Sequence, residues 1–231
     1  MDAIIAASPG RDFLDVGIGT GVSAGPFKAA GCRVLGVEID PRMAEFCRRR
    51  GFEVEVAGFE QWDPAGRTFD AIIAGTTWHW IDPTIGTAKA ARLLRPASRL
   101  TVFWNVARPP ADLALAFSDV YRRVLPGTPF ATPPSDPLSA YAPILTRTTE
   151  VIRQTSALTE PEQWQFDWER DYTADQWLEQ VPTFGGHSNF PPAKLDQLLA
   201  GIRAAIDATG GSMTMRYACL AVSTGRRSDP G

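Results

Sequence analysis

Short apolar runs alternate with helix-like segments through the first hundred residues, and this alternation constrains the fold more than any other feature. The apolar runs lie at residues 12–16, 33–37, 52–56, 69–74 and 100–104. In the segments between these runs the apolar residues have helical spacing, and several of the segments begin with Asp-Pro or end at glycine. Such alternation predicts parallel strands joined by helices, in an α/β fold. In the third run apolar residues alternate with glutamates, which places this strand near an edge.

The pattern changes after Trp104. Leucine, phenylalanine and valine keep helical spacing at residues 113–124, but residues 126–143 contain six prolines and predict a long irregular segment. A strand around Trp164–Trp168 follows, then a helix from Thr173 to about Val181. A longer helix begins at Pro191-Pro192, and residues 212–222 form a last strand.

We expect one domain, residues 1–231, in which residues 105–160 form a lid over the carboxyl edge of the sheet. The tryptophans of the later segments, Trp164, Trp168 and Trp177, have spacings that fit a strand and a helix, so we expect them in the core.

Composition excludes several classes of protein. Hydrophobic residues make up 44% of the chain and charged residues 21%, which is typical of a globular protein. The net charge of −3 gives no electrostatic basis for binding nucleic acid or an anionic membrane. Three dispersed cysteines and two histidines predict neither disulfides nor a metal site. No apolar run is long enough for a membrane helix, and the first residues lack signal-peptide features, so we expect a cytoplasmic protein.

The most informative motif is a glycine-rich turn at the end of the first strand. Gly17, Gly19 and Gly21 alternate there, two residues after Asp15. Glu38 follows 21 residues after Gly17, at the end of the second strand. A carboxylate at that place can accept hydrogen bonds from both ribose hydroxyls of a nucleoside. The two features together indicate a cofactor that contains a nucleoside.

The turn departs from the dinucleotide-binding fingerprint. That fingerprint would place its third glycine at position 22, where this chain has Val22. No Gly-Lys-Ser/Thr of a phosphate-binding loop follows. A nicotinamide-dependent oxidoreductase is therefore the less favoured interpretation.

These motifs resemble the class I S-adenosylmethionine-dependent methyltransferases. The segment Leu14–Gly21 resembles their first motif and Val37–Asp40 their acidic second-strand motif. Residues 69–74 resemble the fourth-strand motif, and residues 94–96 the helix end before strand five. Residues 59–62 and 78–80 are similar to the actinobacterial and trans-aconitate-methyltransferase-like branch. The resemblance covers residues 12–105 well. It implies a Rossmann-like fold, mostly parallel, with a final antiparallel strand pair.

The resemblance also bears on how the pocket is covered. Many members of the family carry one or two helices before the first strand, whereas only about eleven residues precede it here. We therefore expect an open pocket, covered by the proline-rich segment, roughly residues 106–145, or by a second subunit in a homodimer.

The resemblance also implies a function and a site. The reaction would be methyl transfer from S-adenosylmethionine to an O, N or C nucleophile of a small molecule, with S-adenosylhomocysteine as product. A non-catalytic cofactor-binding protein on the same fold is an alternative. The cofactor-binding residues would be Asp15, Gly17, Gly19, Gly21, Glu38, Ile39, Phe59, Glu60, Thr76 and Trp80. Gly58 stands where the family often has an aspartate that contacts adenine, so Glu60 or the backbone of Phe59 would take that part.

Candidates for catalysis are His79, Tyr172 and His187. His79 lies between Trp78 and Trp80, directly after the fourth strand. Two readings stay open for this segment. It is either a hydrophobic plug with one satisfied histidine, or an aromatic face placed against a sulfonium or a substrate.

Overall fold

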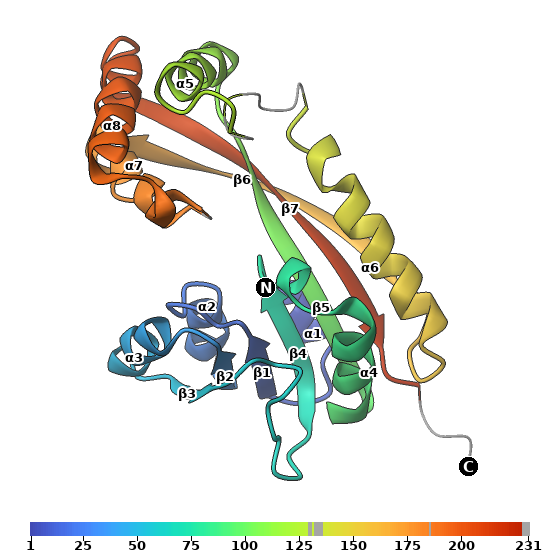
Figure 1. Cartoon of the computed structure of the whole chain (residues 1–231). Helices are drawn as coiled ribbons and strands as arrows, with labels where there is room; N and C mark the ends of the chain where they lie inside the picture. Colours follow the sequence, from blue (N-terminus) through green and yellow to red (C-terminus); the bar gives the residue numbers. More distant parts are fainter. Residues whose placement is uncertain (129–130, 132–135, 185, 228–231) are drawn as a thin grey trace. The chain divides into compact units, whose positions relative to one another are not determined.

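The computed structural model describes residues 1–128, 131, 136–184 and 186–227 (Figure 1). The chain forms two compact units. The first contains Met1–Trp104, Ala142–Gln165 and Leu220–Gly231. The second contains Asn105–Tyr141 and Phe166–Cys219.

Seven strands form one sheet in the order β3-β2-β1-β4-β5-β7-β6. Their bounds are β1 Asp12–Val16, β2 Arg33–Glu38, β3 Glu53–Val56, β4 Phe69–Gly75, β5 Leu94–Arg108, β6 Glu162–Thr173 and β7 Ser212–Gly225. β1 pairs in parallel with β2 and β4, β2 pairs in parallel with β3, and β4 with β5. The predicted parallel sheet is confirmed, and β3 lies at its edge as expected.

The last two strands in the sheet run in opposite directions. The Asp171 carboxylate of β6 accepts a hydrogen bond of 2.6 Å from the Thr214 hydroxyl of β7. Glu169, two residues before Asp171 on β6, pairs with Arg216, which lies two residues after Thr214 on β7. Residue numbers therefore rise along one strand as they fall along the other, as the arrows in Figure 1 also show. The expected antiparallel pair is confirmed.

Helices of the first unit pack against this sheet and each other. Their bounds are α1 Asp2–Ala6, α2 Ala24–Ala29, α3 Pro41–Arg49, α4 Pro83–Leu93 and α6 Ala142–Gln154. α2 packs against β2, α3 packs against β2 and β3, and α4 packs beside α6. Asp40 begins α3 as predicted, because its carboxylate accepts a hydrogen bond from the Arg42 backbone nitrogen. The apolar sides of β1, β4 and β5 form a core in which Phe13, Ile72 and Leu100 have no exposed surface.

The second unit has its own core. Its helices are α5 Ala111–Val124, α7 Ala174–Leu178 and α8 Pro192–Asp207, and both α5 and α7 pack on α8. Thr173 and Gln176 form the predicted capping box at the start of α7. Trp177, Leu198 and Ile202 are buried in this core.

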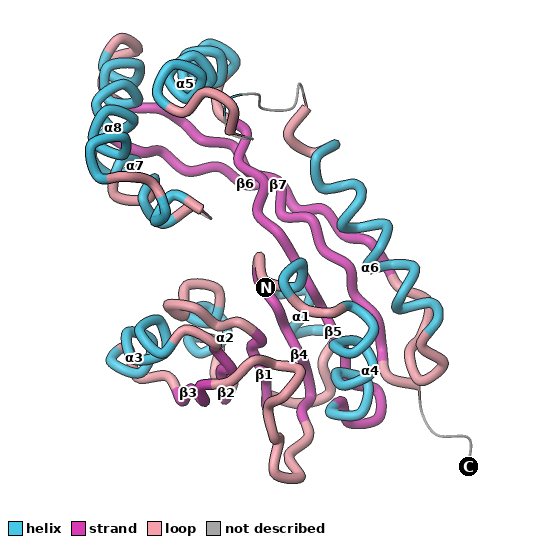
Figure 2. The backbone as a smooth tube through the Cα atoms, in the orientation of Figure 1, coloured by secondary structure: helices cyan, strands magenta, loops and turns pink. Residues whose placement is uncertain are grey.

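Several boundaries differ from the sequence-based expectation. β5 is one strand of 15 residues, longer than the expected 100–104 (Figure 2). α7 ends at Leu178, before the expected Val181, because the chain tightens there into a short 3-10 turn, Val181–Thr183. α6 was not expected at all. Pro143 lies in its first turn, where a missing backbone N–H costs nothing.

The expected lid, residues 105–160, contributes to both units. Residues 105–141 belong to the second unit with α5, and residues 142–160 belong to the first with α6. Residues 129–130 and 132–135 of this segment lie outside the described residues. That this segment covers the carboxyl edge stays a prediction.

Candidate functional site

The candidate cofactor residues gather at one edge of the sheet. Since β1, β2 and β4 are parallel, the segments that follow them meet at the carboxyl edge. Those segments hold the glycine-rich turn after Val16, Ile39 after Glu38, and Thr76 after Gly75. The topology therefore brings together residues that the sequence places about 60 positions apart.

All three glycines of the turn have a left-handed backbone, with φ of +67° at Gly17, +57° at Gly19 and +77° at Gly21. A Cβ at Gly17 would overlap the Thr77 side chain, and a Cβ at Gly21 would lie 2.8 Å from the sulfur of Cys47. Both positions are glycine for reasons of packing as well as conformation.

Gly19 is different. A Cβ there would meet nothing nearer than the carbonyl oxygen of Gly17, at 4.0 Å. No described side chain fills the space beside it, so packing does not require glycine at this position. The absence of a side chain leaves the backbone open to a ligand.

Glu38 connects the turn to the second strand. Its Oε2 accepts a hydrogen bond of 2.8 Å from the backbone nitrogen of Gly19, and its Oε1 accepts one of 2.9 Å from that of Asp40. The residue is 6% exposed. Each carboxylate oxygen can accept a second hydrogen bond. The side chain is therefore fixed in place while it keeps acceptor capacity for a ligand's hydroxyl groups.

Asp15 lies beneath the turn, without exposed surface. Burial raises the pKa of this carboxyl to about 8, and the nearby charge of Glu38 adds to the effect. Ser23 donates a long hydrogen bond of 3.4 Å to Oδ2, which opposes the rise in pKa. Oδ1 has no hydrogen-bond partner among the described residues. A buried acceptor without a partner is costly and rare, so this atom is a candidate for binding a ligand's donor group.

The loop after β3 is held by α4. Lys89, which sequence reasoning did not single out, is 8% exposed and donates its ammonium hydrogens to the carbonyl oxygens of Glu60 and Trp62. Its nitrogen also lies 5.4 Å from the centre of the Phe59 ring. The Glu60 carboxylate accepts a hydrogen bond of 3.0 Å from the backbone nitrogen of Asp82. Phe59 is buried and Glu60 is bonded to Asp82, so the loop is anchored at both residues.

The remaining candidates for cofactor binding reach the surface. Ile39 is 75% exposed and Trp80 is 78% exposed. Thr76 has a φ of +54°, unusual for a β-branched residue, and its nitrogen donates to the carbonyl oxygen of Phe103 at 2.7 Å. Exposed apolar side chains beside an open turn are suited to covering a ligand.

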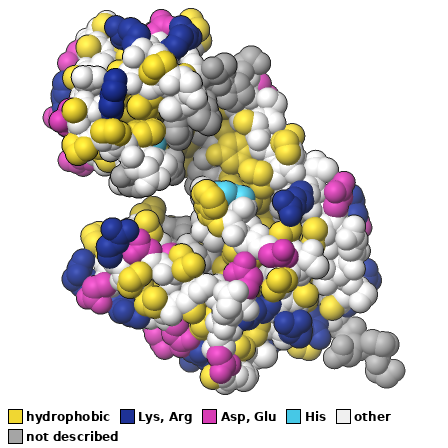
Figure 3. All heavy atoms as spheres, in the orientation of Figure 1, with side chains coloured by type: hydrophobic (Ala, Val, Ile, Leu, Met, Phe, Trp, Pro, Cys, Tyr) yellow, Lys and Arg dark blue, Asp and Glu magenta, His cyan; other side chains and the backbone are white. Residues whose placement is uncertain are grey.

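His79 is bonded to a buried tryptophan. The indole N–H of Trp104 donates to Nδ1 of His79 over 3.2 Å. Since an indole nitrogen only donates, Nδ1 must be the acceptor, and the proton of the neutral imidazole sits on Nε2. Partial burial lowers the pKa of His79. The ring centres of His79 and Trp80 lie 4.9 Å apart. Figure 3 shows that hydrophobic side chains adjoin a histidine on the surface of the molecule.

Trp78 and Trp80 differ in exposure, and the placement of an aromatic face against a sulfonium or a substrate stays a prediction. Trp78 is buried, with the Phe59 ring 6.1 Å away, and acts as the hydrophobic plug. Trp80 is exposed and offers an aromatic face.

Tyr172 and His187 belong to the second unit and lie in its interior. Tyr172 is 3% exposed and accepts a hydrogen bond of 3.1 Å from the Tyr217 hydroxyl. His187 is 1% exposed, with Nε2 2.9 Å from the hydroxyl of Tyr121. The rings of Phe184 and Phe190 lie against the His187 imidazole. These surroundings give both residues a structural role, and catalysis by either stays a prediction.

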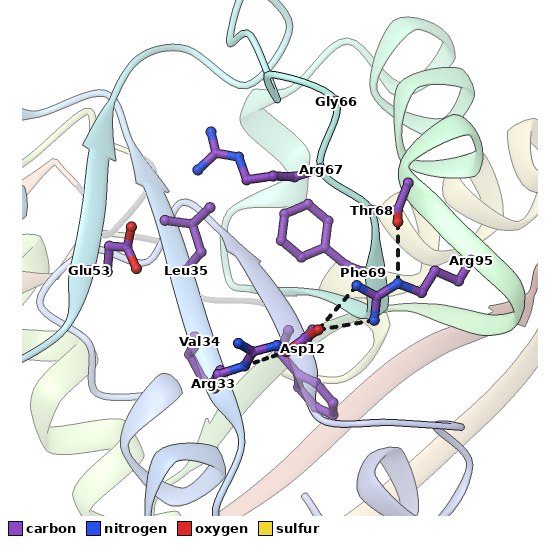
Figure 4. A pocket seen from close by; sticks show the side chains of 11 residues that line it. Asp12, Arg33, Val34, Leu35, Glu53, Gly66, Arg67, Thr68, Phe69 and Arg95 are labelled. Carbon is purple, nitrogen blue, oxygen red and sulfur yellow. Dashed lines mark hydrogen bonds and ion pairs between the residues drawn. The ribbon is translucent and has the colours of Figure 1, made fainter.

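A cavity of about 450 Å³ lies at the opposite edge of the sheet (Figure 4). It is lined by the first residues of four strands, Asp12, Arg33, Glu53 and Phe69, together with Arg95. Arg95 is paired with Asp12 and Asp70, and Arg33 with Asp12. The charges of Asp12, Arg33 and Arg95 are thus paired within the protein, and the cavity is remote from the glycine-rich turn.

Two further observations bear on the kind of protein. Within the described ranges, no three His, Cys, Asp or Glu side chains are grouped so that they could hold a metal ion. The helices described there are all too short or too polar to cross a bilayer.

Comparison with known proteins relates part of the first unit to methyltransferases. Residues 14–102, which contain the glycine-rich turn, Glu38 and β4, match the family model described as a methyltransferase domain. Residues 14–102 are thus similar to a methyltransferase domain. An uncharacterised methyltransferase of Mycobacterium tuberculosis is 33% identical over 97 residues, which is 41% of this chain and 40% of that protein. A demethylmenaquinone methyltransferase of Tropheryma whipplei is 29% identical over 128 residues, 53% of each chain.

Solved structures share the methyltransferase fold over the whole chain. A putative type II methyltransferase from Anaeromyxobacter dehalogenans matches with a TM-score of 0.65 and 19% identity, covering 97% of this chain and 94% of that one. A phosphoethanolamine N-methyltransferase from Haemonchus contortus, solved with S-adenosylhomocysteine, has a TM-score of 0.53 and 14% identity, covering 98% and 52%. At these identities the likeness concerns the fold alone. The chain spans about half or less of the length of the curated relatives it matches.

Proposed function

We propose that the chain binds S-adenosylmethionine at the glycine-rich turn and transfers its methyl group to a small-molecule nucleophile. The observation that carries the proposal is the Glu38 carboxylate, fixed by the nitrogens of Gly19 and Asp40 beside a turn with open space. The relatives that match this part of the chain are methyltransferases.

The residues present fit the parts of this cofactor. Glu38 would accept hydrogen bonds from the ribose hydroxyls, and Gly19 would let its backbone approach the ligand. Oδ1 of Asp15 is a buried acceptor without a partner among the described residues, suited to the ammonium group of the methionine portion. Ile39 would lie against the adenine, with the loop of Phe59 and Glu60 beside it.

The protein would contribute mainly by positioning the acceptor against the cofactor, and less by activating either of them. The sulfonium of S-adenosylmethionine supplies an already activated methyl group. Holding an acceptor in line with that group can lower the barrier by several kcal/mol. Trp80 offers a π face that attracts a cation. His79, with its proton on Nε2, would donate a hydrogen bond to the acceptor or the cofactor, since Nδ1 already accepts from Trp104.

The experiment is transfer of labelled methyl groups from S-adenosylmethionine to an extract of small metabolites. We expect at least one labelled product with the wild-type chain and none with the Gly19→Asn variant. Binding of the cofactor without any labelled product would favour the alternative of a non-catalytic binding protein. Binding of NAD(P) in place of S-adenosylmethionine would favour the oxidoreductase.

The predictions about partners and location belong to the same proposal. We expect no binding to nucleic acid, a cytoplasmic protein, and a homodimer if a second copy covers the site. Sedimentation velocity over a hundredfold range of concentration tests the dimer. Titration with duplex DNA and RNA at low salt tests the absence of nucleic acid.

A further inference from the structure

Trp168 in the second unit is not the core residue that its sequence spacing suggests. It is 41% exposed, and Phe166, two residues earlier in β6, is 46% exposed. Residues two apart on a strand face the same side of the sheet. The core expectation for Trp168 is corrected, while Trp177 is buried as expected. An exposed tryptophan in the middle of a strand needs an explanation of its own.

The exposed indole is held rigidly. Its ring stacks on the ring of Tyr217 with the centroids 4.1 Å apart and the planes at 9°. Its N–H donates to the side-chain oxygen of Asn105 over 3.3 Å. Tyr217 is 8% exposed, and its hydroxyl is bonded to Tyr172. One face of the Trp168 indole is therefore covered and its edge is fixed, which leaves the other face preorganised for contact. We call Trp168, Tyr217 and Asn105 the Trp168 platform.

Polar groups adjoin this platform. Since the indole nitrogen only donates, the amide oxygen of Asn105 faces it, and the amide NH₂ is a donor directed elsewhere. Arg170, two residues after Trp168, faces the same side of β6 and lies 4.8 Å from the centre of the Tyr172 ring. A flat apolar face with a neighbouring amide donor and a guanidinium complements a planar ligand that carries an anionic oxygen.

We propose that the Trp168 platform binds a planar aromatic compound that carries a carboxylate or a similar anionic oxygen group. The stacked indole would supply the apolar face, and the Asn105 amide and the Arg170 guanidinium would supply the polar contacts.

The test uses 1-hydroxy-2-naphthoate as an aromatic anionic probe and cyclohexanecarboxylate as its non-aromatic counterpart. Binding to the full chain is measured by calorimetry, with and without S-adenosylhomocysteine. We expect saturable binding of the naphthoate only. Trp168→Ala should weaken it about tenfold, and Trp168→Phe, which keeps a ring to stack on, by less than about threefold.

Two further variants make the test specific. Leu115→Ala removes an exposed apolar side chain elsewhere in the same unit and should leave naphthoate binding unchanged. Arg170→Met should weaken binding of the naphthoate several-fold but not that of uncharged 1-naphthol. This difference would not arise if Arg170 served only to stabilise the fold.

The proposal is overturned by equal binding to wild type and Trp168→Ala, by equal binding of both probes, or by no binding of naphthoate to wild type. It is also overturned if sedimentation shows a dimer that Trp168→Ala dissociates, since a second copy would then occupy the platform. Failure of the proposed function is a separate result. In that case S-adenosylhomocysteine would not bind the wild type, whereas naphthoate binding without cofactor still reports on the platform.

Discussion

The Glu38 carboxylate accepts a hydrogen bond of 2.8 Å from the backbone nitrogen of Gly19, across the 19 residues that separate the two motifs. The acidic end of the second strand and the glycine-rich turn are thus one structural unit. A ligand that bonds to Glu38 must also lie beside Gly19.

Replacing Glu38 by glutamine should weaken binding of S-adenosylmethionine by roughly 10- to 150-fold, because one charge-assisted hydrogen bond contributes about 1.5–3 kcal/mol. Calorimetry measures the change, and circular dichroism checks the fold. Glu53→Gln is the matched control, since Glu53 begins β3 at the opposite edge of the sheet. Equal affinities for both variants would remove Glu38 from the site.

Replacing Gly19 by asparagine tests the open space in the turn. Asparagine tolerates a left-handed backbone, so the fold should survive, but its side chain would stand where we expect the ligand. We expect loss of cofactor binding with a melting temperature close to that of Gly31→Asn. Gly31 also has a left-handed φ, +83°, and open space around its Cβ. Retained binding in Gly19→Asn would mean that the turn is only structural.

Asp15 should make stability depend on pH. Its folded pKa of about 8 lies above the ordinary 3.8, so between these values the folded protein holds a proton that the unfolded chain has lost. The free energy of unfolding of the ligand-free protein should therefore fall as pH rises from about 4 to about 8. The contribution of one group to this slope is at most about 1.4 kcal/mol per pH unit. Urea titrations at several pH values should show a shallower slope for Asp15→Asn.

The same carboxyl should release a proton when a cationic ligand binds. An ammonium group beside Oδ1 favours the ionised form, which lowers the pKa of Asp15. Binding of S-adenosylmethionine at pH 7 should therefore have a heat that depends on the ionisation enthalpy of the buffer, and an affinity that rises towards pH 8. A heat independent of buffer would contradict the assignment of Asp15 to the ammonium group.

The bond between Trp104 and His79 predicts one tautomer. Nitrogen-15 NMR should find the neutral His79 ring with its proton on Nε2 and a pKa below 6.5. Trp104→Phe removes the donor, so the tautomer preference should weaken and the pKa should rise. His187 is the only other histidine in the chain, and the variant His79→Gln assigns the signals. A proton on Nδ1 in the wild type would contradict the bond and leave Nε2 free to act as a base.

Much of the first unit could be predicted because its signals are local. Apolar runs that end at glycines predicted the strands between Asp12 and Gly75. The pair Asp40-Pro41 predicted the start of α3. The spacing from Gly17 to Glu38 also identified a turn and a carboxylate that are joined by the hydrogen bond from the Gly19 nitrogen to Glu38. These features depend on neighbouring residues and on the regular geometry of parallel strands.

The rest of the fold and of the candidate site depends on contacts between distant residues, which the spacing of residues in the sequence does not predict. The prolines in residues 126–143 predicted an irregular segment, so α6 was missed. Pro143 lies in the first turn of α6, where proline is compatible with a helix. Alternation suggested that Trp168 is buried, but alternation gives only the side of the strand and not whether anything covers it. Lys89 and Trp104 support the site through hydrogen bonds to residues 25 or more positions away, which no local pattern reveals.

The most direct test of the central claim is calorimetric titration of the wild-type chain with S-adenosylhomocysteine, and with NAD⁺ in parallel. The account predicts one equivalent of S-adenosylhomocysteine bound, a raised melting temperature, and no heat with NAD⁺. Binding of NAD⁺ without binding of S-adenosylhomocysteine would contradict it.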